Sequence, residues 1–69
     1  MQTKKQALEF AKLNNIKVTQ FKNDKQQGYV VGNVKVVYCG YGNMFKNENS
    51  NFGLHLGDSL MQAIKLQIN

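Results

Sequence analysis

The amino-acid sequence predicts a small α+β domain with the element order α-β-β-β-α, in which an antiparallel sheet of about three strands carries two helices on one face. Three observations lead to this fold class. Amphipathic segments with capping signals lie near both ends of the chain, and β-branched and aromatic residues concentrate between them. The length of 69 residues suits a single domain, residues 1–69.

The first helix is expected over residues 3–14. Thr3 and Gln6 have the spacing of a capping box, in which the threonine hydroxyl accepts the backbone N–H three residues on. Small and apolar side chains then recur on one helical face, at Ala7, Phe10 and Ala11. Asn14-Asn15 favours a helix end, because asparagine tolerates the left-handed conformation.

Three β-strands are expected next. Ile16–Phe21 alternates apolar and polar residues and is rich in β-formers, and the polar residues 22–27 form a loop. Residues 28–39 carry the strongest β signal. They form either two strands, Tyr29–Val31 and Val34–Cys39, joined by a tight Gly32-Asn33 turn, or one strand with a bulge at Gly32. We favour the hairpin.

Residues 40–53 are predicted to be an irregular loop, because they hold three glycines and four asparagines. An irregular segment of this length in so small a domain is often functional. Its large apolar side chains either fold back over the sheet or face solvent, where they would form a protein-recognition patch. These candidate partner-binding residues are Tyr41, Met44, Phe45 and Phe52.

The second helix is expected to begin at Gly57-Asp58-Ser59, with Asp58 and Ser59 capping it and complementing its dipole. Leu54–Leu56 can add a short strand before it. The buried stripe of this helix is expected to consist of Leu60, Met61, Ile64 and Ile68.

The tetrapeptide Gly57-Asp58-Ser59-Leu60 resembles the signature of the GDSL hydrolases, in which the serine is the nucleophile. The surrounding residues 51–60 are similar to the pantetheine-attachment loop of carrier proteins, in which the serine carries the phosphopantetheine arm. The first resemblance implies a histidine and an acid downstream, but no His, Asp or Glu follows Leu60. The second implies an acidic helical bundle, whereas this chain is basic and β-rich. We therefore interpret Ser59 as a structural residue.

No catalytic site, metal site or cofactor is expected. Cys39 and His55 are the only thiol and imidazole, which is too few for a protein-built zinc site. Their spacing gives no support to a nucleophile–base pair. Gly40-Tyr41-Gly42 follows a strand but lacks either nucleotide-binding fingerprint. We expect a non-enzyme, and the remote alternative is a small toxin-like nuclease that uses His55.

The formal charge of +5 comes from nine lysines against four acidic residues, and arginine is absent. Lysines with tyrosine and phenylalanine neighbours suit a nucleic-acid surface, where cations contact phosphates and rings stack on bases. The absence of arginine argues against sequence-specific base readout. The candidate nucleic-acid-binding residues lie in the more positive N-terminal half and are Lys4, Lys5, Lys12, Lys17, Lys22 and Lys25.

The leading hypothesis is a non-enzymatic binding module, an inhibitor or adaptor that docks a sheet face and residues 40–53 on a larger protein or complex. The lysine- and asparagine-rich composition of this chain is typical of short proteins encoded by phages and mobile elements. A small chain without a disulfide often gains stability from a second copy, so a homo-oligomer is a further alternative. The longest apolar run, Val36–Cys39, is too short to span a membrane, and the first residues lead into an amphipathic helix and not a signal sequence. We expect a cytoplasmic protein.

Overall fold

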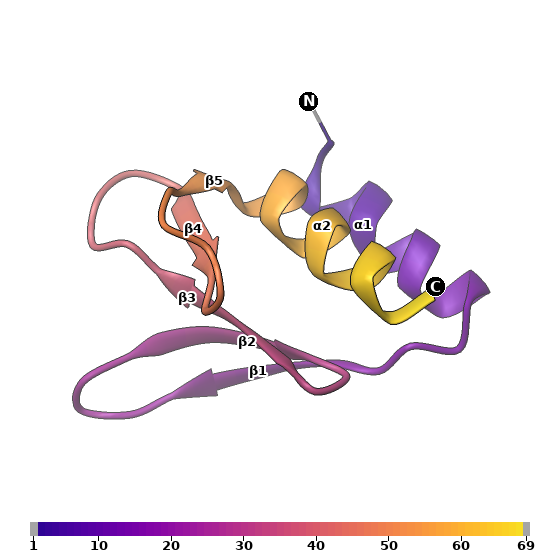
Figure 1. Cartoon of the computed structure of the whole chain (residues 1–69), viewed down its shortest axis with the longest axis horizontal. Coiled ribbons are helices and arrows are strands. Elements are labelled where there is room, and N and C mark those ends of the chain that lie inside the picture. Colours follow the sequence, from indigo (N-terminus) through magenta and orange to yellow (C-terminus); the bar gives the residue numbers. More distant parts are fainter. Residues whose placement is uncertain (1, 69) are drawn as a thin grey trace.

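Two helices lie on one face of a twisted five-stranded antiparallel sheet in the computed structural model, which describes residues 2–68 (Figure 1). The strands follow one another across the sheet in chain order. The α+β fold class is confirmed, and the sheet has more strands than the three expected. The elements are α1 (Lys4–Leu13), β1 (Val18–Lys22), β2 (Gln27–Val31), β3 (Val34–Tyr38), β4 (Met44–Asn47), β5 (Leu54–His55) and α2 (Leu56–Ile68).

Helix α1 has the capping box that the sequence predicts. The Thr3 hydroxyl accepts the Gln6 backbone N–H at 3.1 Å, and Gln6 Oε1 accepts the Thr3 N–H at 3.0 Å. Asn14 caps the other end, and Asn15 follows in the left-handed region with a φ of 58°. Both ends are therefore set by local side-chain chemistry.

The hairpin between β2 and β3 is confirmed, and the alternative of a bulge at Gly32 is wrong. Val31 pairs directly with Val34, so two residues form the turn. Gly32 has a φ of 59°, whereas Asn33 has no positive φ. A positive φ confined to the first central position is the type II′ pattern, which matches the twist of the flanking strands.

Strand β4 lies inside the segment that was expected to be irregular, so that expectation is wrong for Met44–Asn47. Tyr38 pairs with Phe45 on one side of β4, and Phe45 pairs with Leu54 on the other. Pairing with β3 and β5 outweighs the local glycine and asparagine content, since strand formation depends strongly on tertiary context. Two shorter loops remain, the β3–β4 loop (residues 39–43) and the β4–β5 loop (residues 48–53).

The core lies between the sheet and α2, which packs against β2, β3, β4 and β5 and against α1. Alternation along the strands directs Tyr29, Val31, Val36 and Phe45 toward the helices. The fully buried Leu60 and Ile64 of α2 meet them, whereas Ile68, which was expected in the buried stripe, is exposed. Ala7 and Ala11 bury the inner face of α1. None of the helices within residues 2–68 is both long enough and apolar enough to cross a membrane.

The start of α2 is packed tightly against the residues that precede α1. A side chain at Gly57 would overlap the backbone of Gln2 and Thr3, and the Asp58 carboxylate accepts the Gln2 N–H at 2.6 Å. Ser59 does not cap the helix as predicted. It is fully buried one turn inside α2, because the helix begins at Leu56, and its hydroxyl is used for contacts with the sheet.

Candidate functional site

The structure separates the four predicted partner-binding residues. Phe45 is 9% exposed and belongs to the core, where its ring lies 6.0 Å from the Tyr29 ring and 5.2 Å from the Tyr38 ring. Met44 is half-buried on the sheet face opposite the helices. Tyr41 in the β3–β4 loop and Phe52 in the β4–β5 loop are each 61% exposed. The burial of Phe45 removes it from any docking surface.

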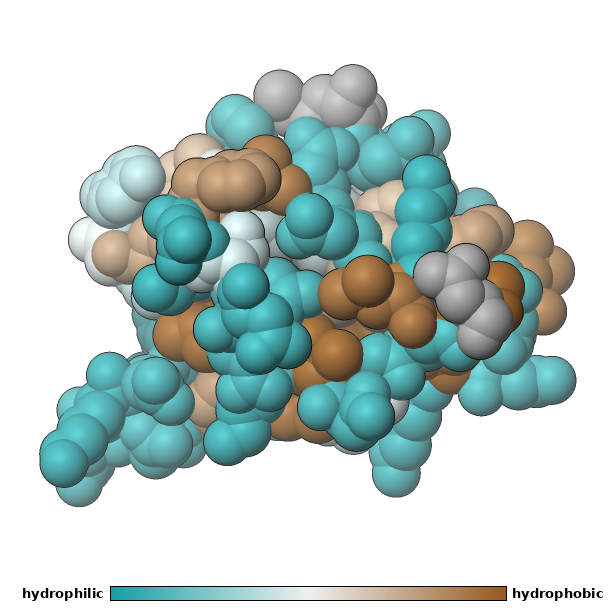
Figure 2. Space-filling model, viewed as in Figure 1, coloured by the Kyte–Doolittle hydropathy of each residue, from teal (hydrophilic) through white to brown (hydrophobic). Residues whose placement is uncertain are grey.

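Phe52 borders a groove between the β4–β5 loop and the C-terminal half of α2. This loop–helix groove has a volume of about 460 Å³. Leu66 of α2, which is 53% exposed, lies on the opposite wall from Phe52. Brown apolar surface is visible over the C-terminal half of α2 in the centre of the space-filling view (Figure 2). The lining residues are Asn47, Asn49, Ser50, Asn51, Phe52, Gln62 and Leu66.

Hydrogen bonds hold the loop wall of the groove in shape. The buried Asn47 side chain accepts the Asn49 N–H at 3.0 Å, and the Asn47 carbonyl accepts the Ser50 N–H at 2.8 Å. The Ser50 hydroxyl then donates to the Phe52 carbonyl at 3.2 Å. Phe52 is therefore presented to solvent by a hydrogen-bonded turn, which reduces the entropy lost when a partner binds it.

Gln62 supplies an unusual feature of the groove. Its Oε1 is the one buried side-chain nitrogen or oxygen within residues 2–68 that has no hydrogen-bond partner. A buried acceptor left unpaired costs about 1–3 kcal/mol, so such groups are uncommon in folded proteins and need an explanation. Gln62 lines the groove, and a rotation about its soft terminal torsion would be needed to bring the Oε1 into contact with a ligand there. The group that would then pair with it is an N–H donor.

Sequence reasoning missed both groove residues on α2. A signal existed for Leu66, because it lies two positions from Ile64 and so on the side of the helix away from the buried stripe. Nothing in the sequence distinguishes Gln62 from the other six glutamines.

The residues that could carry nucleophilic chemistry do not come together. The Ser59 hydroxyl is buried and donates to the backbone carbonyls of Phe45 at 2.6 Å and Leu54 at 3.3 Å. Cys39 and His55 both lie beside Met44, one on each side of it, because the Cys39 N–H donates to the Met44 carbonyl and Met44 pairs with His55. The Cys39 Sγ lies close to Gly53, and no hydrogen bond joins Cys39 to His55 within residues 2–68.

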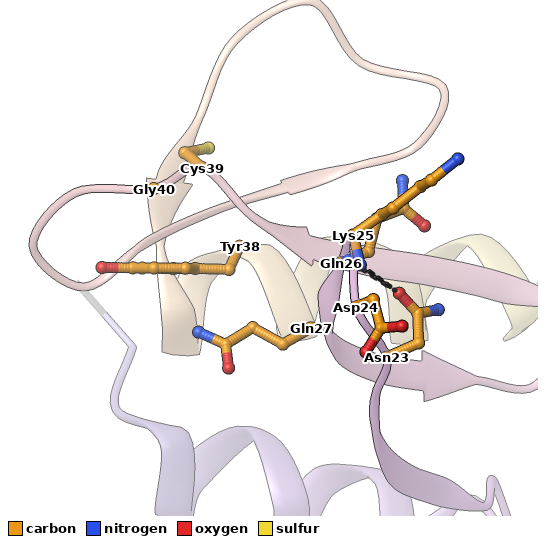
Figure 3. Close-up of a pocket in the computed structure, with 8 residues that line it drawn as sticks. All are labelled: Asn23, Asp24, Lys25, Gln26, Gln27, Tyr38, Cys39 and Gly40. Carbon is orange, nitrogen blue, oxygen red and sulfur yellow. Dashed lines mark hydrogen bonds between the residues drawn. The ribbon is translucent and has the colours of Figure 1, made fainter.

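A second hollow lies at the end of the sheet, where the β1–β2 turn faces the end of β3 (Figure 3). Its volume is about 400 Å³, and its lining is largely the polar turn 23–27 with Tyr38, Cys39 and Gly40. Asn23 Oδ1 accepts the Gln26 N–H at 2.7 Å within that turn. The side chains of Tyr38 and Lys25 lie at opposite ends of the view, so no set of polar groups converges on one point.

The predicted lysines lie on a helix and on the first hairpin of the sheet. Lys4, Lys5 and Lys12 belong to α1, and Lys4 Nζ lies 5.3 Å from the Tyr29 ring centroid. Lys17 precedes β1, Lys22 ends it, and Lys25 lies in the β1–β2 turn. Three of the six residues therefore belong to α1, and the other three lie in β1 or next to it.

A different set of lysines lies on the sheet face that carries no helix, here called the open face. Strand alternation and register place Phe21, Val37 and Lys46 in one row of this face, and Lys35 in the next. Lys35 Nζ lies 5.8 Å from the Phe21 ring centroid, which confirms that the two share a face. Lys35 and Lys46 were absent from the predicted set.

No cluster of three or more histidine, cysteine, aspartate or glutamate side chains that could hold a metal ion occurs within residues 2–68. Comparisons with protein-family models, curated protein sequences and solved structures find no match to this chain.

Proposed function

We propose that this chain is a non-enzymatic protein-binding module that takes an apolar side chain of a larger protein into its loop–helix groove. The observation that carries the proposal is the placement of two exposed apolar side chains, Phe52 and Leu66, on opposite walls of a groove that also holds the unpaired Gln62 Oε1. A groove that combines apolar side chains with polar groups that fix orientation is typical of recognition sites.

The chemistry of the groove defines the kind of partner segment that fits it. An apolar anchor between Phe52 and Leu66 would remove both side chains from water, which contributes about 25 cal/mol per Å² of apolar surface buried. A few such anchors carry most of the affinity in protein interfaces. A backbone or side-chain N–H next to the anchor would satisfy Gln62 Oε1. The expected partner segment therefore offers a large apolar residue beside a free N–H.

The test compares two aromatic residues that are equally exposed but lie in different loops. Phe52→Ala removes one wall of the groove, whereas Tyr41→Ala truncates an aromatic side chain of the β3–β4 loop outside it. Each tagged variant is used to capture partners from the native host, and binding of the captured protein is then measured with purified components. We expect Phe52→Ala to weaken binding at least about tenfold, a loss of about 1.4 kcal/mol, and Tyr41→Ala to change it less than about twofold.

Equal binding by Phe52→Ala and the unmodified chain would exclude the groove as the docking site. A loss confined to Tyr41→Ala would move the site to the β3–β4 loop. Circular dichroism of both variants provides the control for folding, because both side chains lie outside the core.

Nucleic-acid binding is the second candidate, and the open face is the surface that favours it. Lys35 above the Phe21 ring, with Lys46 in the adjoining row, combines cationic groups with an aromatic side chain, as single-strand-binding surfaces do. The double variant Lys35→Glu/Lys46→Glu is compared with Lys5→Glu/Lys12→Glu, which makes the same charge change on α1. This candidate requires an oligonucleotide affinity that falls steeply with salt concentration. The affinity should be lost in Lys35→Glu/Lys46→Glu and retained in Lys5→Glu/Lys12→Glu. Binding that nuclease treatment of the lysate leaves intact counts against it.

A further inference from the structure

The edge strand β1, Val18–Lys22, pairs with β2 on one side, and nothing within residues 2–68 pairs with its other side. The opposite edge of the sheet, β5, has only two residues. The register between β1 and β2 continues without a skipped residue from Val18↔Val31 to Lys22↔Gln27, and the sequence contains no proline. Strand β1 therefore lacks the bulge or proline that commonly protects an edge strand from pairing.

The hydrogen bonds at the two ends of the β1–β2 hairpin determine which backbone groups of β1 point outward. The Gly32 N–H donates to the Lys17 carbonyl at 3.2 Å, and the Asn23 N–H donates to the Gln26 carbonyl at 2.8 Å. Hydrogen-bonded and non-hydrogen-bonded pairs alternate along an antiparallel ladder, so the odd-numbered residues of β1 bond to β2. The even-numbered residues then direct their N–H and C=O groups away from the sheet. These residues are Val18, Gln20 and Lys22.

We infer that β1 pairs with β1 of a second copy of this chain, antiparallel and about a two-fold axis at Gln20. The outward-facing residues are symmetric about Gln20, so this register places each of them opposite another. Gln20 meets the partner's Gln20, Val18 meets the partner's Lys22, and Lys22 meets the partner's Val18. Each of these three pairs can exchange two hydrogen bonds.

The side chains are compatible with this register. Lys22 lies opposite a valine and not opposite a second lysine, which avoids a like-charge pair. On the open face, Thr19 lies opposite the partner's Phe21, so the two open faces become one continuous surface. Neither Gln20 nor Lys22 is buried in the single chain, which leaves both free to pair. The result is one sheet that runs through two copies.

An interface of one five-residue strand is small, so the pairing is expected to be weak, with a dissociation constant on the order of 0.1–1 mM. Sedimentation velocity and light scattering over a concentration series up to about 1 mM test it on the full chain. The unmodified chain should shift from the mass of one copy toward that of two. A single-copy mass throughout the series would overturn the inference.

Three variants test the register. Gln20→Lys places two lysines opposite each other at the axis, and Gln20→Pro removes an outward N–H that the single chain does not use. Each should raise the dissociation constant at least about tenfold while circular dichroism stays unchanged. Asn43→Lys makes the same charge change at an exposed position of the β3–β4 loop and should associate like the unmodified chain. Association that Gln20→Lys leaves unaltered, or that Asn43→Lys weakens equally, would overturn the assignment to β1.

Discussion

The Gln62 Oε1 is the buried polar atom on which the proposed recognition site can be tested most locally. It has no hydrogen-bond partner within residues 2–68, which costs stability, and a donor that reaches it would remove that cost. By contrast, the buried hydroxyl of Ser59 donates to two carbonyls of the sheet and so has its hydrogen-bonding capacity used within the chain. The difference between these two polar groups of α2 is the residue-scale observation that supports the proposed groove.

Replacement of Gln62 by methionine tests this contrast. Gln62→Met keeps the length of the side chain and removes the unpaired acceptor, so the free energy of unfolding should rise by about 1 kcal/mol. The partner affinity should fall, because the partner's N–H would lose its acceptor. Urea denaturation measures the first change and titration with the captured partner the second. A fall in stability would show that Gln62 makes favourable contacts within the free chain.

At the scale of elements, the features that the sequence predicted correctly are the helix ends and the turn that neighbouring residues determine. The capping box at Thr3 and Gln6, the left-handed residue after α1 and the Gly32 turn all depend on side chains within a few residues of one another. Strand β4 was missed because Met44–Asn47 is a strand only through its pairing with β3 and β5. The groove was missed for the same reason, since its walls come from the β4–β5 loop and from α2, and only tertiary packing brings them together.

The contact between α2 and the chain before α1 gives a prediction at this scale. Glycine to alanine within a helix usually stabilises a protein, by about 1 kcal/mol. At Gly57 the added Cβ would overlap the Gln2 carbonyl and lie 2.5 Å from the Thr3 carbonyl carbon, so Gly57→Ala should destabilise the fold by about 1–3 kcal/mol.

Urea denaturation followed by circular dichroism measures the effect of Gly57→Ala. Lys65→Ala, at an exposed position of the same helix, is the control and should change the unfolding free energy by less than about 0.5 kcal/mol. An increase in stability for Gly57→Ala would mean that residues 2–3 do not pack on the first turn of α2.

At the scale of the whole molecule, size limits what the fold can offer. In this domain of 69 residues, one sheet face and both helices form the single core. Any binding surface must therefore be made of loops, the outer sides of the helices, the other sheet face or a strand edge. Three candidate surfaces lie on different sides of that core, namely the loop–helix groove, the open face and the edge of β1. The proposed partner in the groove and the proposed second copy at β1 would therefore not compete for one surface.

The groove is tested most directly by a pair of exposed leucines on the two helices. Leu66→Asp places a carboxylate on the apolar wall of the groove, and Leu13→Asp makes the same change at the end of α1, where the leucine is 82% exposed. The affinity of each purified variant for the captured partner is measured by calorimetry. We predict at least about a tenfold loss for Leu66→Asp and less than about a twofold change for Leu13→Asp. Equal affinities for the two variants would contradict the assignment of partner binding to the groove.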